Sequence, residues 1–297
     1  MRFPAQFIFI EVRLDSLRAG FPLTGATAPD TGSGARSSLV RSARGVMLLP
    51  TDDTGHPLAE RFRHFIRQQP FPCVGAKSAL SRGQMKVLVA GDIASERDDA
   101  RIYPALLAFI CRYRARRDLF QSFAVVFEGP RRLSEEAFEA ALWKRMQSLS
   151  DRDSVLGHSQ DPRVSANPDD SHFSMSLGGE GFFIVGLHPG ASRKARRFER
   201  PVLVFNLHDQ FERLRAEGRY ERLRDSIVER DVAWAGSANP MLAQHGERSA
   251  ARQFSGRAVP DDWVCPYHRR EEVREWDAQQ VAADLRSGAF VAGQMEG

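Results

Sequence analysis

Three cysteines and eight histidines are the residues of this 297-residue chain best suited to metal ligation or redox chemistry. Cys73 stands out because it follows a Phe-Pro pair and precedes Val-Gly-Ala, in what should be a turn leading into a helix. Backbone N–H groups at a helix N-terminus stabilise a thiolate and lower its pKa. Gly75 would let a flat ligand approach the backbone closely. Cys73 is therefore a candidate metal-ligating thiolate, and a small buried hydrophobic residue is the alternative interpretation.

The histidines do not form a zinc-type motif, since the closest pair in the sequence, His56 and His64, is eight residues apart. His188 ends an apolar run before Pro-Gly, and His208 lies between an expected strand and an expected helix. Open sheets place binding groups at such positions. His245 lies in the polar loop AQHGERS. Each of these three is a candidate ligand or proton donor, or alternatively a cap of its neighbouring element.

The strongest local charge asymmetry is a run of basic residues opposed by Glu199 alone: Arg193, Lys194, Arg196, Arg197 and Arg200. The planar guanidinium of arginine pairs well with carboxylates, so this segment is a candidate site for an anionic group. A solvated loop face is the alternative.

Composition and charge exclude several classes of function. With 42% hydrophobic and 27% charged residues the chain has the composition of a globular protein. Residues 1–46 carry six arginines against three acids, so the remainder is nearly neutral, and its arginines alternate with Asp and Glu along helices. We therefore expect no nucleic-acid partner. No apolar run approaches the ~20 residues that span a bilayer, so we expect no membrane partner. Three cysteines make no disulfide framework, so we expect a cytoplasmic location. Walker, GxGxxG and GxSxG motifs are missing.

The elements that must position these residues alternate between helical and extended patterns. Helices are expected from Pro57, after Cys73, over 98–118, from Ser134 and over 208–218, and strands over 85–93, 121–130, 201–207 and, as a Gly-rich hairpin, within 172–189. This pattern predicts an α+β fold with a mixed, largely antiparallel central sheet and a single main domain, 47–297. Residues 1–46, rich in Gly, Ser, Thr and Pro, are predicted to be a disordered extension.

Three blocks carry a resemblance to a known family: PFPCVGAKSAL, SLGGEGFFIVGLHPGASRKARRFERPVLVFNLHDQFERLR and GSANPMLAQHGERSAARQFSGR. Over about residues 56–267 the chain resembles the YqcI/YcgG family. Some members of that family, including the N-hydroxylase of the guanitoxin pathway, are heme-dependent oxygenases that act on guanidino nitrogen. The resemblance thus implies a YqcI/YcgG-like heme-binding domain with heme b (iron protoporphyrin IX), O₂ chemistry, a guanidino or amine substrate and an unidentified electron donor.

Residue by residue, the cysteine block of the family falls on Cys73, its histidine blocks on His188 and His208, and its loop on Asn239, His245 and Glu247. We expect Cys73 to be the axial ligand of the iron, because thiolate donation favours O–O cleavage. Histidine also supports oxygen activation in other heme proteins, so His208 and His188 remain rival ligands.

The expected function is N-hydroxylation of an arginine-like substrate. The residues expected at the cofactor are Cys73, Gly75, Lys77, His188, Arg193, Lys194, His208 and Arg257, and those expected in catalysis are His245, Asn239 and Glu128. The arginines and Lys194 would pair with propionate or substrate carboxylate, Glu128 would hold a guanidinium, and His245 and Asn239 would steer protons or bind oxygen. Two alternatives are a heme-binding or sensing protein without turnover, and an α+β interaction protein without a cofactor.

Overall fold

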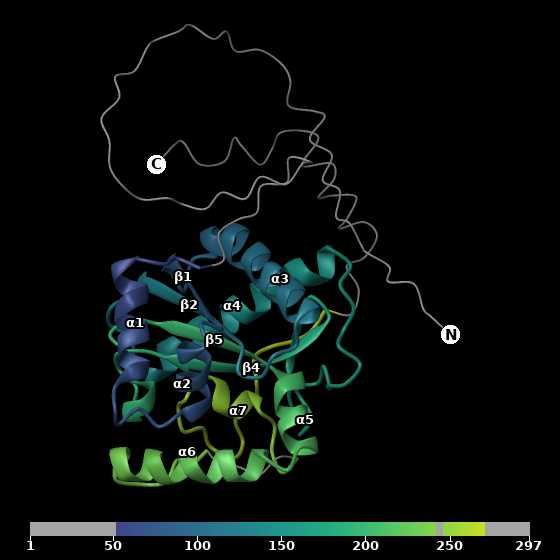
Figure 1. The fold of residues 1–297 in the computed structure, drawn as a ribbon. Helices are drawn as coiled ribbons and strands as arrows, with labels where there is room; N and C mark the ends of the chain where they lie inside the picture. The colour runs from purple at the N-terminus through teal and green to yellow at the C-terminus, as the bar shows by residue number, and fades with distance from the viewer. Residues whose placement is uncertain (1–51, 242–245, 271–297) are drawn as a thin grey trace, which may run out of the picture. The chain divides into compact units, whose positions relative to one another are not determined.

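The computed structural model of the chain describes residues 52–241 and 246–270 (Figure 1). They belong to one unit of the chain, which begins at Leu48. The extension predicted for residues 1–46 and the expected proton donor His245 lie outside the described residues. In the described part no helix combines the length and hydrophobicity needed to cross a membrane.

A five-stranded sheet forms the centre, with strand order β1-β2-β5-β4-β3 (Figure 1). Its strands are β1 (Met85–Asp92), β2 (Ser122–Gly129), β3 (Met175–Leu177), β4 (Glu180–Leu187) and β5 (Val202–Leu207). Only β1 and β2 pair in parallel, and the other three pairs are antiparallel. The predicted α+β fold with a largely antiparallel sheet is confirmed.

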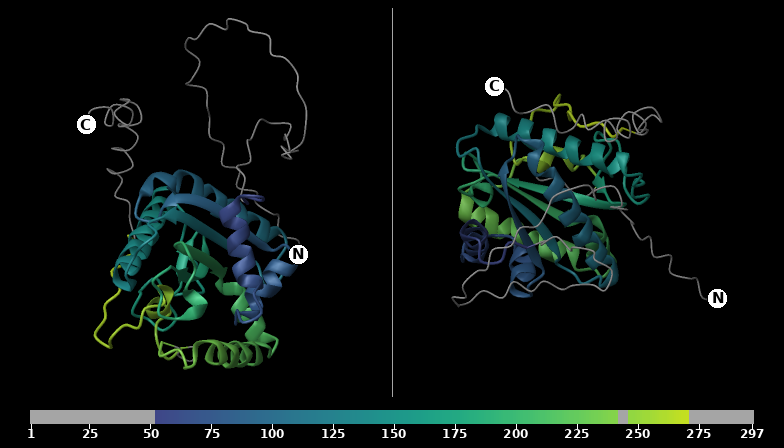
Figure 2. Two further views of the ribbon diagram at one scale, coloured as in Figure 1. Left: turned by 90° about the vertical axis from the view of Figure 1, so that its left-hand side faces the viewer. Right: turned by 90° about the horizontal axis from the view of Figure 1, so that it is seen from above.

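Both faces of the sheet are covered, because side chains on each strand alternate between two apolar cores. In β1, Leu88 and Ala90 face one core, whereas Val87 and Val89 face the other. The first core is closed by α3 (Asp99–Ala115) and α4 (Glu135–Val155), and the second by α1 (Pro57–Arg67) and α2 (Val74–Ser81). Figure 2 shows the sheet between these helices.

Helix α3 connects the two parallel strands and buries one stripe, which includes Ile102, Leu106, Phe109 and Tyr113. Cys111 belongs to the same helix but is exposed. Its position explains the exposure, since Cys111 lies two residues from Phe109 and thus about 200° around the helix from it. Cys111 is therefore a surface thiol away from the core.

The remaining helices are α5 (His208–Ala216), α6 (Tyr220–Ala235) and α7 (Ala251–Phe254), with short 3₁₀ turns η1 (Glu96–Asp98) and η2 (Lys194–Arg196). Helix α6 lies beyond α2 and α7, along one end of the described region (Figure 1). None of its residues is fully buried. It touches α2, α5 and η2. The apolar stripe of α6 is therefore only partly covered.

A buried ion pair joins α4 to the start of α3. Arg145 is 1% exposed and Asp99 is fully buried, and the two side chains are hydrogen-bonded. The Arg145 guanidinium also donates to the carbonyl oxygen of Ile93 at 2.9 Å. Arg145 therefore ties α4 to the start of α3 and to the turn between β1 and η1.

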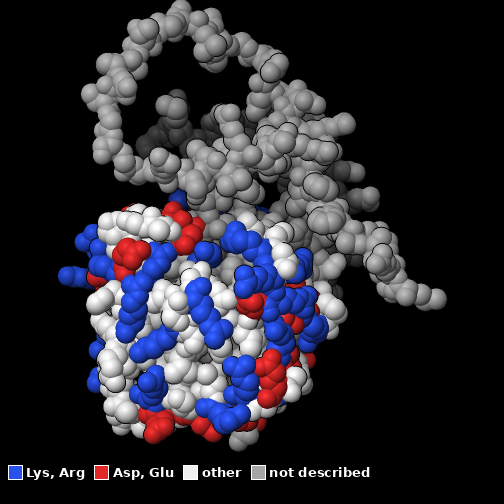
Figure 3. All heavy atoms as spheres, viewed as in Figure 1, with Lys and Arg blue, Asp and Glu red and all other residues white. Residues whose placement is uncertain are grey.

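The surface drawn in Figure 3 mixes basic and acidic side chains, with the basic ones predominating. Several of them form exposed pairs, such as Arg61 with Glu199 at 2.6 Å and Arg219 with Glu217 at 2.7 Å. Within α5, Arg215 pairs with Glu212 at i,i+3 spacing, which agrees with the expectation that alternating charges mark solvated helix faces.

Candidate functional site

A cavity of about 360 Å³ lies between the α1–α2 side of the sheet and α6. Its size falls in the ~300–1,000 Å³ range of small-molecule and cofactor sites. Most of its lining is apolar and comes from α1, β1, β4, β5 and α6, for example Phe62, Met85, Phe183, Val204, Leu223 and Ile227. Cys73, Gly75, Arg193 and Asn239 also line it. The structure thus brings together four of the residues selected from the sequence.

Cys73 is the N-cap of α2, as the turn-to-helix pattern predicts. Its backbone is extended, and its Sγ accepts a hydrogen bond from the Ala76 N–H at 3.4 Å. Burial nevertheless raises the pKa of the thiol, although the N–H groups of Ala76 and Gly75 and the charge of Arg196 act to lower it. The expected lowering of the pKa is therefore outweighed by desolvation. A metal bound here would displace the thiol proton.

The cavity wall beside the sulfur lacks a side chain at Gly75. A Cβ atom placed there would lie 3.8 Å from Cys73 Sγ and 3.5 Å from Phe120 Cδ1. Phe120 itself has a φ of 65°, in the left-handed region that bulky residues rarely adopt. Strained backbone of this kind tends to cluster at functional sites. A side chain at Gly75 would therefore pack between the sulfur and the ring of a strained phenylalanine.

Arg196 brings a positive charge to the same cavity. Its guanidinium donates to the carbonyl oxygens of Gly186 at 2.9 Å and Phe254 at 3.1 Å. Burial lowers the pKa of Arg196 to about 10, and Asp231 and Cys73 counteract this effect. The side chain is thus held rigidly by backbone carbonyl groups and stays protonated at neutral pH. A fixed cation near a thiol favours its ionised form and attracts carboxylates.

Other members of the basic run fasten α6 to the loop after β4. Arg193 pairs with Asp231 of α6 and donates to Ser237 Oγ at 3.1 Å. Lys194 Nζ donates to the carbonyl oxygen of Trp234 at 2.8 Å. These contacts position the helix that covers the cavity. Arg193 lines the cavity, whereas Lys194 does not.

Three further candidates lie apart from the lining of this cavity. Lys77 Nζ donates to the carbonyl oxygen of Gln68 at 2.7 Å, just after α1. Arg257 forms a two-pronged pair with Glu139 of α4, both contacts being 2.8 Å. Glu128 is exposed near the end of β2. The structure therefore does not bring these side chains to Cys73.

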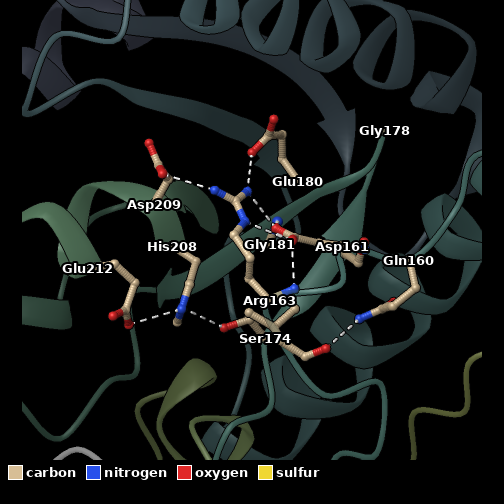
Figure 4. A network of polar contacts seen from close by, with 12 residues as sticks. Gln160, Asp161, Arg163, Ser174, Gly178, Glu180, Gly181, His208, Asp209 and Glu212 are labelled. Carbon is tan, nitrogen blue, oxygen red and sulfur yellow. Dashed lines mark hydrogen bonds and ion pairs between the residues drawn. The ribbon is translucent and has the colours of Figure 1, made fainter.

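The two rival histidines also lie outside the lining. His188 is buried and stacks on Phe138 with ring centroids 4.3 Å apart. Burial lowers the pKa of His188 to about 4, which keeps the imidazole neutral at neutral pH. His208 Nε2 contacts Glu212 Oε1 at 3.1 Å, and its Nδ1 lies 3.3 Å from Ser174 Oγ (Figure 4). Both rings are engaged in local packing.

A separate polar network surrounds Arg163 (Figure 4). Its guanidinium pairs with Asp161 at 2.7 Å, Glu180 at 2.6 Å and Asp209 at 2.9 Å. Arg114 contributes a second guanidinium to Glu180 at 2.7 Å. These pairs join the loop before β3 to β4 and α5. Among the described residues no group of three or more His, Cys, Asp and Glu side chains has the arrangement of a metal site.

Comparison with known proteins identifies the family of this chain. The YqcI/YcgG family model matches residues 62–268, which include every cavity residue discussed above. The chain belongs to the YqcI/YcgG family. A relative from Bacillus subtilis (strain 168), "Uncharacterized protein YqcI", is 26% identical over 155 residues, which are 50% of this chain and 59% of the relative's length. No solved structure matches the chain.

Sequence reasoning on this YqcI/YcgG chain missed Asp231 and Arg224, which line the cavity, and did not single out Arg196 from its basic run. The signal was present in α6, where Leu223, Ile227 and Val228 recur at helical spacing. Because charged residues alternate with them, the segment has the pattern of a solvated helix. The stripe predicts a covering helix only when the space beneath it is known.

Proposed function

We propose that this YqcI/YcgG protein is a heme-dependent monooxygenase that N-hydroxylates a guanidino or related amine compound with O₂ and a separate electron donor. The observation that carries the proposal is the position of Cys73 at the edge of an apolar cavity that also holds Arg196. The proposal further rests on the resemblance to family members with this activity. It includes a cytoplasmic location, which suits three free cysteines.

The residues present fit heme b. Cys73 offers a sulfur ligand, Gly75 adds no side chain beside it, and the aromatic and aliphatic lining suits a flat apolar ring. Arg196 and Arg224 are the cavity cations suited to propionate groups. When bound, the heme would supply the binding and reductive activation of O₂.

The chain's own residues have three roles in this proposal. Cys73 gives up its thiol proton and donates electron density through sulfur. Arg196, fixed by backbone carbonyl groups, presents its charge to a carboxylate without reorganisation. The apolar lining contributed by α6 excludes water, which strengthens each electrostatic contact in the cavity.

The direct test is turnover. We expect protein reconstituted with hemin, reductant and O₂ to convert L-arginine or agmatine into a product heavier by one oxygen atom, as measured by mass spectrometry. The control omits O₂. A reconstituted protein that keeps its Soret band but oxidises no guanidine or amine would favour the sensing alternative. A colourless protein after incubation with hemin would contradict the proposal and favour the interaction-protein alternative.

Substituting Gly75→Ala should separate cofactor binding from folding. The new Cβ makes ordinary contacts with Phe120 and Cys73, and alanine in a helix is favoured over glycine by up to about 1 kcal/mol. Thermal unfolding should therefore occur at the same or a higher temperature. Because the methyl group narrows the wall beside the sulfur, hemin binding should weaken by about 1–3 kcal/mol, the usual cost of overpacking. Unaltered hemin affinity in a titration would place the cofactor elsewhere.

A further inference from the structure

We propose that Asp231 Oδ1 is the acceptor that holds the guanidinium of the substrate in the α6 cavity. This inference rests on the proposed function and deepens it by naming a substrate-binding residue. It replaces Glu128 in that role, because Glu128 is exposed and outside the cavity lining, whereas Asp231 is part of it.

The ion pair beside the cavity leaves two polar atoms unmatched. The Arg193 side chain is 10% exposed and the Asp231 side chain 15% exposed. Asp231 Oδ2 accepts from Arg193, but Asp231 Oδ1 and Arg193 Nε are buried without a hydrogen-bond partner within residues 52–241 and 246–270. Leaving a buried polar group without a partner destabilises the folded chain. A donor on a bound ligand would satisfy the free carboxylate oxygen.

The free oxygen needs a hydrogen-bond donor, and a charged donor pairs with a carboxylate more strongly than a neutral one. A carboxylate is only an acceptor, and its two oxygens can serve two guanidinium groups at once. The same chain shows this arrangement at Glu180, whose Oε1 binds Arg114 at 2.7 Å and whose Oε2 binds Arg163 at 2.6 Å. At Asp231, Arg193 occupies one oxygen. A substrate guanidinium on the other oxygen would complete the same pattern.

The position of Asp231 also suits the reaction. It belongs to the face of α6 that carries Ile227 and Val228 into the cavity, and Cys73 lines the same cavity. The charged end of a substrate at Asp231 would therefore share one water-poor space with the cofactor ligand. Charge-assisted hydrogen bonds are strong in such surroundings.

The test compares Asp231→Asn with Glu229→Gln, an exposed acid on the same helix, in the full chain. Agmatine binding is measured by calorimetry with and without hemin, and the Soret band is recorded for each protein. We expect Asp231→Asn to weaken agmatine binding roughly 10- to 100-fold, the usual size of a lost charged hydrogen bond, with an unchanged Soret band. Glu229→Gln should bind as the wild type does. Equal affinities for all three proteins would overturn the inference.

A second measurement needs no variant and covers the case in which Asp231→Asn fails to fold. N-Carbamoylputrescine differs from agmatine by carrying a neutral urea group in place of the guanidinium. The wild-type chain should prefer agmatine by about tenfold or more. Because both compounds carry the same primary ammonium group, equal binding would reject Asp231 as a guanidinium site. Loss of the Soret band in the wild type would reject the proposed function instead, while the calorimetry without hemin would still decide the role of Asp231.

Discussion

Replacing Cys73 with alanine should abolish sulfur-ligated heme and, with it, all hydroxylation of guanidines. The expected effect is complete because Cys73 is the one cysteine among the described residues that line the cavity, and the thioether of Met85 cannot ionise to a thiolate. Absorption spectra after titration with hemin, together with product analysis, measure both effects.

The matched control is Cys111→Ala. Cys111 is exposed on α3, away from the cavity lining, so its removal should leave both the spectrum and turnover unchanged. His188→Ala and His208→Ala should likewise keep the thiolate-type spectrum, although each disturbs local packing. If Cys73→Ala retains its colour and activity while His208→Ala loses them, the axial ligand is the imidazole and the account of the site is wrong.

The second large effect concerns stability. Asp99→Ala should lower the free energy of unfolding by about 3–5 kcal/mol, because it leaves the buried charge of Arg145 without its carboxylate. Urea or thermal unfolding gives the value. The control is Glu96→Ala, which removes an exposed partner of Lys144 at 3.8 Å and should cost less than about 1 kcal/mol.

A double variant makes the stability prediction specific to the pair. Asp99→Ala combined with Arg145→Met removes both buried charges, so it should be more stable than Asp99→Ala alone. Equal losses from Asp99→Ala and Glu96→Ala, or a further loss in the double variant, would show that the pair does not act as a buried ion pair.

Much of the fold follows from local patterns. The apolar runs at β1 and β2 predict strands, and Ser134 caps α4 as expected, with its Oγ accepting from the Ala137 N–H at 3.1 Å. Strand order is a different matter. It depends on which apolar faces meet, and residues such as Phe123 and Phe205, 82 positions apart in the sequence, contact each other only in the folded sheet.

The site was partly predictable for the same reason. Cys73 could be found because a Phe-Pro pair, a cysteine and a following Val-Gly-Ala segment determine a local turn and helix start. Asp231 could not be found in this way, because its position in the site depends on the contact with Arg193, 38 residues away, and on a cavity formed by distant elements. The contacts of the basic run could not be predicted from the sequence either, because Arg196 donates to carbonyl oxygens of residues as distant as Phe254.

The most direct test of the central claim is the absorption spectrum of the hemin-loaded protein after reduction and addition of carbon monoxide. A Soret maximum strongly shifted to the red is the result expected for sulfur ligation by Cys73. A maximum in the ordinary globin region would assign the iron to an imidazole, and a spectrum without any Soret band would contradict heme binding altogether.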